Sequence, residues 1–170
     1  DDHKFQVTMN TAHQRGRPPI FHYILANEGT YTPPAMMLYS ILSSYFTGGS
    51  KCTFVHVNRK CRPAGPVWDA LKAWVRVREA RCPSKVGHVK DSELLWVTQR
   101  SDFYRLLVLL REGGSYVDND VLIQSRLVSS LQSGATIMIE EPITNPYKDY
   151  HVVSAFIQAE VGHPFIREWL

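Results

Sequence analysis

Two aspartates, Asp118 and Asp120, interrupt the segment "SYVDNDVLI", whose other residues are typical of a buried strand. A carboxylate in such a place costs several kcal/mol unless something compensates its charge. In an extended strand residues i and i+2 point the same way, which puts Tyr116, Asp118 and Asp120 on one face. The two carboxylates are then separated by roughly 6.5–7 Å of backbone. Oxygen ligands at this spacing favour Mg²⁺ or Mn²⁺, ions that usually share their shell with substrate phosphates.

A bare D-x-D pair is a weak motif, and an Asp-Asn-Asp turn that faces water fits it equally well. Two residues on the preceding helix raise its specificity. Asp102 and Arg105 are three residues apart and therefore share one side of that helix, away from its predicted apolar face. They form either a surface ion pair, which contributes little to stability, or a charged pair that reaches the same cleft as the aspartates.

The chain around these residues alternates predicted strands with predicted helices. Strands rich in β-branched and aromatic residues are expected at 18–25, 51–58, 75–79, 115–123, 135–140 and 152–160. Helices, several with proline near the start, are expected at 32–46, 65–74, 97–114 and 163–170. This alternation indicates an α/β domain with a mostly parallel central sheet flanked by helices.

Two of these segments carry sharper predictions. The helix at 97–114 has apolar residues at i, i+3, i+4 and i+7, which predicts one buried face, and Gly113 or Gly114 as its stop. That face consists of Phe103, Leu106, Leu107 and Leu110. The strand at 75–79 alternates valine with arginine, as a half-exposed strand does.

Composition excludes several classes of protein. The chain has 170 residues and a net charge of +3, values typical of a globular domain. Its apolar stretches are too short to cross a membrane, and its aromatic residues do not alternate with Lys and Arg as in a nucleic-acid groove.

Residues 1–100 hold 14 Lys and Arg against 7 Asp and Glu, whereas 101–170 hold 5 against 9. This division is either an uneven surface or a place where an anion and a cation bind side by side.

The three cysteines, Cys52, Cys61 and Cys82, match no zinc spacing and are interpreted as inert thiols. The four tryptophans are interpreted as core or interface residues. The N-terminus lacks the basic start and apolar centre of a signal peptide. Residues 1–17 are interpreted as an extension and 18–170 as one domain that lacks its C-terminal part.

The segment "RSDFYRLLVLLREGGSYVDNDV" resembles the S-D-x-x-R-x-x-x-L-x-x-x-G-G-x-Y-x-D-x-D signature of glycosyltransferases with a DXD-containing sugar-binding region. That family includes initiating α-1,6-mannosyltransferases and α-1,4-galactosyl- and N-acetylglucosaminyltransferases. "PPIFHYIL" and "SAFIQAEVGHPFI" resemble two further blocks of the family, so the resemblance runs from about Pro19 to the end. The matching positions of the signature are Ser101, Asp102, Arg105, Leu109, Gly113, Gly114, Tyr116, Asp118 and Asp120.

The resemblance implies a GT-A fold and a metal-dependent, retaining transfer of a hexose from a nucleotide-diphosphate sugar, such as UDP- or GDP-hexose, to a glycan or other hydroxyl acceptor. It makes Asp120 the direct Mn²⁺ or Mg²⁺ ligand, and Asp118 a contact of the ribose or donor sugar and of the metal through water. Asp102 is then expected to bind sugar hydroxyls, and Arg105 to stabilise charge near the diphosphate. Donor binding is further expected of Tyr23, Ile24, Leu25, Tyr116 and Asn119.

The chain departs from the family pattern at two positions. Leu25 stands where the family often has an aromatic residue that stacks on the nucleotide base, and Tyr23 is the candidate to replace it. Ser154 stands where the downstream block usually begins with asparagine.

Two rival functions fit parts of the sequence. A haloacid-dehalogenase-type phosphatase also has D-x-D after an apolar strand, but the D-D or D-x-x-x-D pair it needs downstream does not occur after Asp120. A non-catalytic nucleotide-sugar-binding module of the same fold is the stronger alternative. For a glycosyltransferase, the expected location is the Golgi or secretory lumen in a eukaryote and the cytoplasm in a bacterium or virus.

Overall fold

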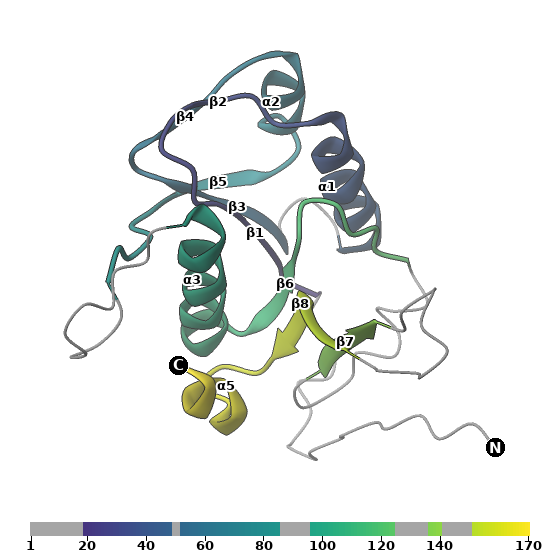
Figure 1. The fold of residues 1–170 in the computed structure, drawn as a ribbon. Coiled ribbons are helices and arrows are strands. Elements are labelled where there is room, and N and C mark those ends of the chain that lie inside the picture. The colour runs from purple at the N-terminus through teal and green to yellow at the C-terminus, as the bar shows by residue number, and fades with distance from the viewer. Residues whose placement is uncertain (1–18, 49–51, 86–95, 125–135, 141–150) are drawn as a thin grey trace, which may run out of the picture.

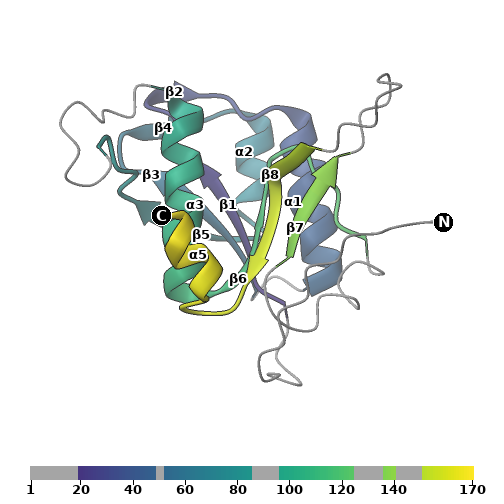
Figure 2. The same cartoon turned by 60° about the horizontal axis from the view of Figure 1, so that its bottom comes forward.

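The structure is a computed structural model that describes residues 19–48, 52–85, 96–124, 136–140 and 151–170. The segment 1–17, interpreted above as an extension, lies outside these residues. The described part folds around a central sheet with helices on both faces (Figures 1 and 2). Its elements, in chain order, are β1 (Phe21–Leu25), β2 (Gly29–Tyr31), α1 (Ala35–Gly48), β3 (Thr53–Asn58), β4 (Cys61–Pro63), α2 (Pro66–Leu71), β5 (Arg76–Ala80), α3 (Val97–Glu112), β6 (Gly114–Val117), β7 (Thr136–Glu140), β8 (His151–Ala159) and α5 (Pro164–Trp169).

The main sheet has the strand order β5-β3-β1-β6-β8-β7. Strands β5, β3, β1 and β6 run parallel, whereas β8 runs antiparallel to both β6 and β7. The predicted α/β class and the mostly parallel sheet are therefore confirmed. Because the carboxyl ends of β5, β3, β1 and β6 meet at one edge, the segments that follow these strands lie where open α/β sheets bind ligands. A separate pair, β2 with β4, lies beyond that edge in Figure 1.

Two apolar clusters fill the space between the sheet and its helices. Alternate residues of β1 point to opposite faces, so Tyr23 packs with α1 and α2 while Ile24 packs with α3 and α5. Every residue of β1 and β3 is buried, as expected of parallel strands covered on both sides.

The predicted buried face of α3 is wrong in part. Of its four residues only Leu106 is buried, while Phe103, Leu107 and Leu110 are partly exposed. The helix carries apolar residues on most of its sides, so the i, i+3, i+4, i+7 spacing is satisfied by more than one helix face. The residues that α3 buries are Tyr104, Arg105, Leu106, Val108 and Leu109.

The outer strand β5 also differs from its prediction. Val77 is 45% exposed, because β5 lies at the edge of the sheet. The Arg78 guanidinium lies 3.7 Å from the centre of the Phe54 ring and forms an ion pair with Glu112 at 2.5 Å. A cationic side chain therefore covers the apolar surface that the alternation had assigned to valine.

The three cysteines, all within the described residues, are thiols that form no disulfide with one another, in agreement with their interpretation as thiols. The tryptophans are less buried than expected: Trp74, Trp96 and Trp169 are all exposed, and only Trp68 packs against the core. Within the described part of the chain, no helix is both long and apolar enough to cross a membrane.

Candidate functional site

The aspartate pair lies in a turn, so its predicted position within an extended strand is wrong. Strand β6 ends at Val117, and the Val121 amide donates a hydrogen bond to the Asp118 carbonyl at 3.2 Å. The turn also stays attached to the sheet, because the Asp118 amide donates to the Ala155 carbonyl of β8 at 2.8 Å. Asp118 is partly buried and Asp120 is exposed. The pair thus lies directly after the carboxyl end of β6, at the ligand-binding edge of the sheet.

Serines of α1 hold this turn, and the sequence analysis did not identify them. The buried Ser40 hydroxyl donates to the Val121 carbonyl at 2.5 Å and also lies 3.1 Å from the Asp118 carbonyl. The Ser43 hydroxyl accepts a hydrogen bond from the Ile123 amide at 2.8 Å. Small polar residues in an otherwise apolar helix were the available signal, because a buried hydroxyl needs a partner.

Arg105 is the buried centre of the site, with 5% of its surface exposed. Its Nη2 lies 2.5 Å from Asp102 Oδ1 and 3.6 Å from Asp118 Oδ1, and its Nη1 donates to the Ser154 carbonyl at 2.5 Å. Its guanidinium lies 4.1 Å from the centre of the Tyr116 ring. The side chain therefore connects α3, β6 and β8 at one point.

Protein groups partly compensate Asp118. The Tyr116 hydroxyl donates a hydrogen bond to Oδ1 of the Asp118 carboxylate, and the Arg105 guanidinium forms an ion pair with the same oxygen. The pKa of Asp118 is nevertheless raised, first by burial and then by the charges of Asp120 and Asp102, against the lowering effects of Tyr116 and Arg105. Arg105 pairs with Asp102 and Asp118, and the charge of Asp120 adds to that of Asp118, which leaves an excess of negative charge beside the turn.

Asp102 and Arg105 were predicted to share a side of α3 away from its apolar face, and this is wrong for Arg105. The arginine is buried with the apolar residues of the helix, while Asp102 stays 55% exposed. Such burial is tolerated because the guanidinium is paired and hydrogen-bonded. The structure brings together Asp102, Arg105, Tyr116, Asp118, Asn119 and Asp120 in one region, and their roles toward a donor stay predictions.

The side chains of β1 face the core. Tyr23, Ile24 and Leu25 are at most 4% exposed. The Tyr23 hydroxyl donates to the Ser40 carbonyl at 2.9 Å, and burial raises its pKa to about 12. In this packing the Tyr23 ring cannot stack on a base. Its hydroxyl instead bonds to Ser40, the serine that holds the aspartate turn. Donor contacts at the end of β1 therefore depend on backbone groups and on the residues that follow.

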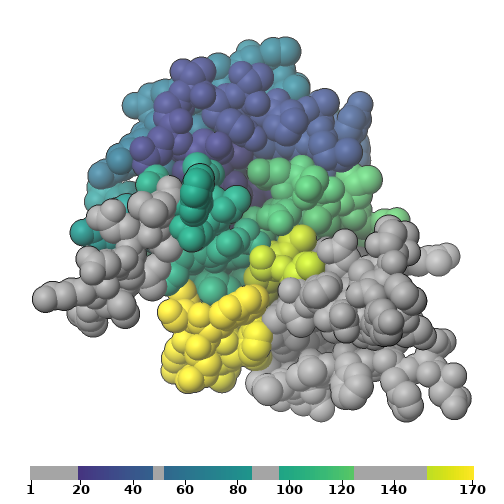
Figure 3. Space-filling model, viewed as in Figure 1, coloured from purple at the N-terminus to yellow at the C-terminus, as the bar shows by residue number. Residues whose placement is uncertain are grey.

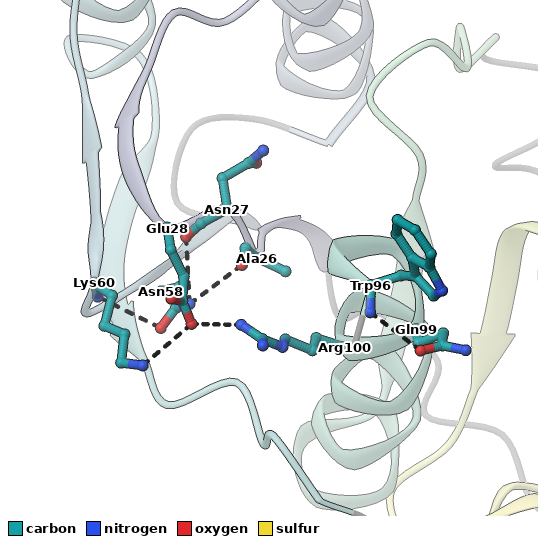
Figure 4. A network of polar contacts seen from close by, with 8 residues as sticks. All are labelled: Ala26, Asn27, Glu28, Asn58, Lys60, Trp96, Gln99 and Arg100. Carbon is teal, nitrogen blue, oxygen red and sulfur yellow. Dashed lines mark hydrogen bonds and ion pairs between the residues drawn. The ribbon is translucent and has the colours of Figure 1, made fainter. Parts of the chain in front are cut away.

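A polar network fixes the segment after β1, as Figure 4 shows. The buried Asn58 at the end of β3 donates to the carbonyls of Ala26 and Asn27 at 3.2 and 3.3 Å. Glu28 forms ion pairs with Lys60 and with Arg100 in the first turns of α3. The carboxyl ends of β1 and β3 are thereby tied to the helix that carries Asp102.

Charges divide along this edge of the sheet. Arg59 and Lys60 follow β3 and Arg81 follows β5, and all three are exposed. Asp118 and Asp120 follow β6 on the other side of β1. The uneven charge of the sequence thus becomes a basic and an acidic part of one edge.

Two histidines on neighbouring strands of the sheet, His22 of β1 and His56 of β3, form a buried pair. His22 Nδ1 lies 3.0 Å from His56 Nε2, and His22 Nε2 lies 2.9 Å from the Gly113 carbonyl. A carbonyl can only accept, so His22 donates through Nε2 and accepts from His56 through Nδ1. Burial lowers the pKa of His22 to about 4 and that of His56 to about 3, so both rings are neutral at pH 7. The pair is structural, as histidines without a ligand pattern usually are.

The turn suits a hard divalent cation. Its donors are carboxylate oxygens, and the exposed Asp120 is open to an incoming ligand. Among the described residues no three His, Cys, Asp or Glu side chains form a group able to hold a metal. Mg²⁺ and Mn²⁺ commonly bind through one or two carboxylates plus substrate phosphates, so this small donor set fits them.

Comparison with known families agrees with this geometry. Residues 72–143 match the family model described as "Glycosyltransferase sugar-binding region containing DXD motif". The match spans α3, β6 and the aspartate turn. This part of the chain is therefore similar to the DXD-containing sugar-binding region of glycosyltransferases. No match was found among curated proteins.

A solved structure supports the fold. The structure titled "PaToxG Glycosyltransferase" aligns with 89% of this chain at a TM-score of 0.53 and 17% sequence identity. The chain covers 58% of that structure's length. At this identity the likeness establishes a shared fold.

Proposed function

We propose that the chain is the donor-binding part of a metal-dependent glycosyltransferase that transfers a hexose from a nucleotide-diphosphate sugar. One observation carries this proposal: the buried Arg105 pairs with Asp102 and Asp118, and Asp120 adds its charge beside Asp118, at the ligand-binding edge of the sheet. A site with surplus carboxylates is suited to a cation, and such a cation can hold a diphosphate. The basic residues on the same edge are suited to the negative charge of that diphosphate.

In this proposal Asp120 and Asp118 hold Mn²⁺ or Mg²⁺. When bound, the ion stabilises the negative charge that develops on the diphosphate as the bond to the anomeric carbon breaks. Tyr116 fixes one oxygen of Asp118, so the other oxygen faces the ligand or its water shell. Asn119 stands between the two aspartates in the same turn, and we propose it as a further contact of the donor.

Asp102 and Arg105 act as a pair. Arg105 holds the Asp102 carboxylate at 2.5 Å, which leaves the other carboxylate oxygen to accept hydrogen bonds from sugar hydroxyls. The Arg105 guanidinium is committed to protein partners, so it contributes a fixed positive charge close to the site. We propose a glycan or other hydroxyl compound as acceptor and retention of the anomeric configuration. The location proposed is the Golgi or secretory lumen for a eukaryotic source and the cytoplasm for a bacterial or viral one.

A panel of nucleotide sugars tests this function. We expect UDP- or GDP-hexoses to raise the melting temperature of the chain in the presence of Mn²⁺ and not in the presence of a chelator. Asp120→Asn should abolish the Mn²⁺-dependent rise. Asp69→Asn is the matched control, because Asp69 is an exposed aspartate of α2 paired with Lys72. A rise that persists in Asp120→Asn would show that the metal assignment is wrong.

A nucleotide-sugar-binding module is the second candidate, because the side chain of Leu25 lies in the core and offers no ring to a base. Slow metal-dependent hydrolysis of the bound donor distinguishes the two. An enzyme releases nucleoside diphosphate at a rate that Asp102→Asn and Asp118→Asn both lower. A module binds the donor and releases none above the rate without protein.

A further inference from the structure

The outer edge of the main sheet at β5 is open. β5 is the last strand on its side of the sheet, as the row of strands in Figure 1 shows, and no described segment pairs with its outer side. In Figure 3 the blue-to-teal part of the chain, which includes β5, reaches the surface beside α3. An open strand edge presents backbone N–H and C=O groups on which a further strand can pair.

The backbone groups that face outward belong to Val77 and Glu79. The Arg59 amide, just after β3, donates a hydrogen bond to the Ala80 carbonyl at 2.8 Å, so the backbone of Ala80 faces β3. Successive residues of a strand bond to opposite neighbours, and Asn58 of β3 stands opposite Ala80 in this register. Val77 and Glu79, three and one positions before Ala80, therefore present their amides and carbonyls to the outside.

The two faces of this edge differ in chemistry. Arg76 and Arg78 lie on the face that α3 covers, over the ring of Phe54, and their guanidinium carbons are 5.9 and 3.7 Å from the centre of that ring. Val77 and Glu79 lie on the other face, where Val77 is 45% exposed. A strand added here would therefore meet two guanidinium groups on one face, and a valine followed by a carboxylate on the other.

Positive charge prevails on the α3 face of the edge. Arg78 forms an ion pair with Glu112 at 2.5 Å, whereas Arg76 is exposed and forms no ion pair with a described residue. Arg111, the neighbour of Glu112 in α3, is also exposed. Among the described residues on this face, three guanidinium groups thus stand against one carboxylate.

These charges select the kind of strand that can pair with β5. Charged side chains protect strand edges because a neutral partner strand would bury them without compensation. A second copy of the chain is disfavoured as well, since two such edges would bring arginines against arginines. A strand with carboxylates on the matching face compensates the arginines while its backbone pairs with β5.

We infer that the outer edge of β5 is a docking site for an extended acidic segment of a partner protein, which adds a strand to the sheet and places alternate carboxylates over Arg76 and Arg78. β3 and β1 lie between β5 and the strand that precedes the aspartate turn. The inference therefore does not depend on the proposed function.

Two blocked and labelled hexapeptides of the same composition test this docking site. One alternates valine with glutamate, which puts all its glutamates on one face of a strand, and the other has its valines first and its glutamates last. We expect the alternating peptide to bind the full chain about tenfold more tightly than the other, as measured by fluorescence anisotropy at low ionic strength. Hydrogen exchange at the Val77 and Glu79 amides should slow when the alternating peptide is bound.

Variants of the edge separate backbone pairing from charge. Val77→Pro removes one outward amide and leaves the hydrogen bonds to β3 in place, so it should weaken binding by about tenfold or more, whereas Val77→Ala should change it by about threefold at most. Arg76→Gln should weaken binding by about three- to tenfold, because it removes a charge but no backbone group. Arg167→Gln, at an exposed arginine of α5, is the control for charge and should leave binding unchanged.

Peptides with N-methyl groups test the same hydrogen bonds in the wild-type chain, so the test stands even if Val77→Pro does not fold. Only alternate amides of an added strand face β5. Methylation at the valines and methylation at the glutamates should therefore differ, because one form loses binding and the other keeps it.

Tighter binding of the alternating peptide that slows exchange at the two amides and is weakened by Val77→Pro supports the docking site. Equal binding of the two hexapeptides, or unchanged exchange at both amides, overturns it, because charge alone then holds the peptide. Absence of binding by either peptide, or equal binding of the two N-methylated forms, overturns it as well. A dimer of the wild-type chain that Val77→Pro separates, measured by light scattering, would make a second copy the occupant and overturn the acidic partner.

Discussion

Arg105 shows how one residue organises several others. A buried guanidinium is costly unless its charge is paired, and here two carboxylates, a carbonyl and an aromatic ring surround it. The same contacts fix the positions of Asp102 and Asp118. At this scale the chemistry of the site and the stability of the fold depend on the same atoms.

Replacing Arg105 tests that dependence. Arg105→Met keeps an unbranched apolar stem but removes the guanidinium, which leaves Asp118 without its cation. We expect a loss of about 2–3 kcal/mol in the free energy of unfolding, below the ~3–5 kcal/mol of a fully buried pair because Asp102 and Asp118 are partly exposed. Urea denaturation measures it.

Arg111→Met, on the exposed surface of the same helix, is the control and should change stability by about 0.5 kcal/mol or less. A similar small effect of Arg105→Met would show that the guanidinium does not support this site.

At the scale of elements, α1 acts as the support of the aspartate turn. Ser40 is wholly buried, and its hydroxyl connects the helix to the Val121 and Asp118 carbonyls. Tyr23 reaches the same serine from β1. The turn therefore keeps its shape through a helix whose Ser40 precedes Val121 by 81 residues, and through a strand that lies earlier still in the chain.

Ser40→Ala should destabilise the fold by about 1–2 kcal/mol, because the part-buried Val121 carbonyl loses the hydroxyl that donates to it. It should also weaken Mn²⁺-dependent donor binding, since the turn is no longer held. Thermal unfolding and titration calorimetry measure the two effects. Thr47→Ala is the control, because the Thr47 hydroxyl bonds only to the Ser43 carbonyl of its own helix. Unchanged donor binding in Ser40→Ala would contradict the supporting role of α1.

The junction between α3 and β6 depends on a close approach of the backbone. Gly114 has a φ of +92°, and a Cβ there would lie 2.8 Å from the Ile20 carbonyl oxygen. We expect Gly114→Ala to lower the free energy of unfolding by about 3 kcal/mol or more, from strain and collision together. Gly29→Ala separates the two effects, because Gly29 has a φ of +74° with nothing within 4 Å of its Cβ position. Equal losses of unfolding free energy in both variants would show that the contact with the Ile20 carbonyl contributes nothing.

At the scale of the whole molecule, the pair of neutral histidines makes stability depend on pH. The pKa values of His22 and His56, about 4 and about 3, lie below the 6.5 of histidine in an unfolded chain. The unfolded state therefore takes up protons first as the pH falls. This contribution to stability is complete above about pH 6.5 and is lost as the pH falls through the folded values.

We expect the free energy of unfolding to fall between pH 6.5 and pH 4 by up to about 1.4 kcal/mol per pH unit for each histidine. Urea denaturation at several pH values measures the slope. His56→Gln keeps a donor toward His22 but removes one titrating ring, so its slope should be smaller. An equal slope in the variant would mean that other groups cause the acid sensitivity.

The sequence predicted the fold well because strong local signals coincide with the main elements. β1 and β3 are continuous apolar runs, and α3 ends at a glycine stop, so their type and order could be read directly. The signature also identified Asp102, Arg105, Tyr116 and Asp118, which do meet in space. The buried face of α3 and the residue at which β6 ends could not be predicted from the sequence, because both depend on contacts with other parts of the fold. Arg105 is buried because residues of β6 and β8 pair with it, and β6 ends where Ser40 binds the following turn.

Titration calorimetry of a nucleotide sugar into the wild-type chain and into Asp120→Asn, each with Mn²⁺ and with a chelator, shows whether the aspartate turn holds the metal and the diphosphate. We expect donor binding to the wild type that needs Mn²⁺, and loss of most of that binding in Asp120→Asn while the melting temperature without ligand stays unchanged. Donor binding of equal strength with and without Mn²⁺, or in the two proteins, would contradict the assignment of the aspartate turn as the metal and diphosphate site.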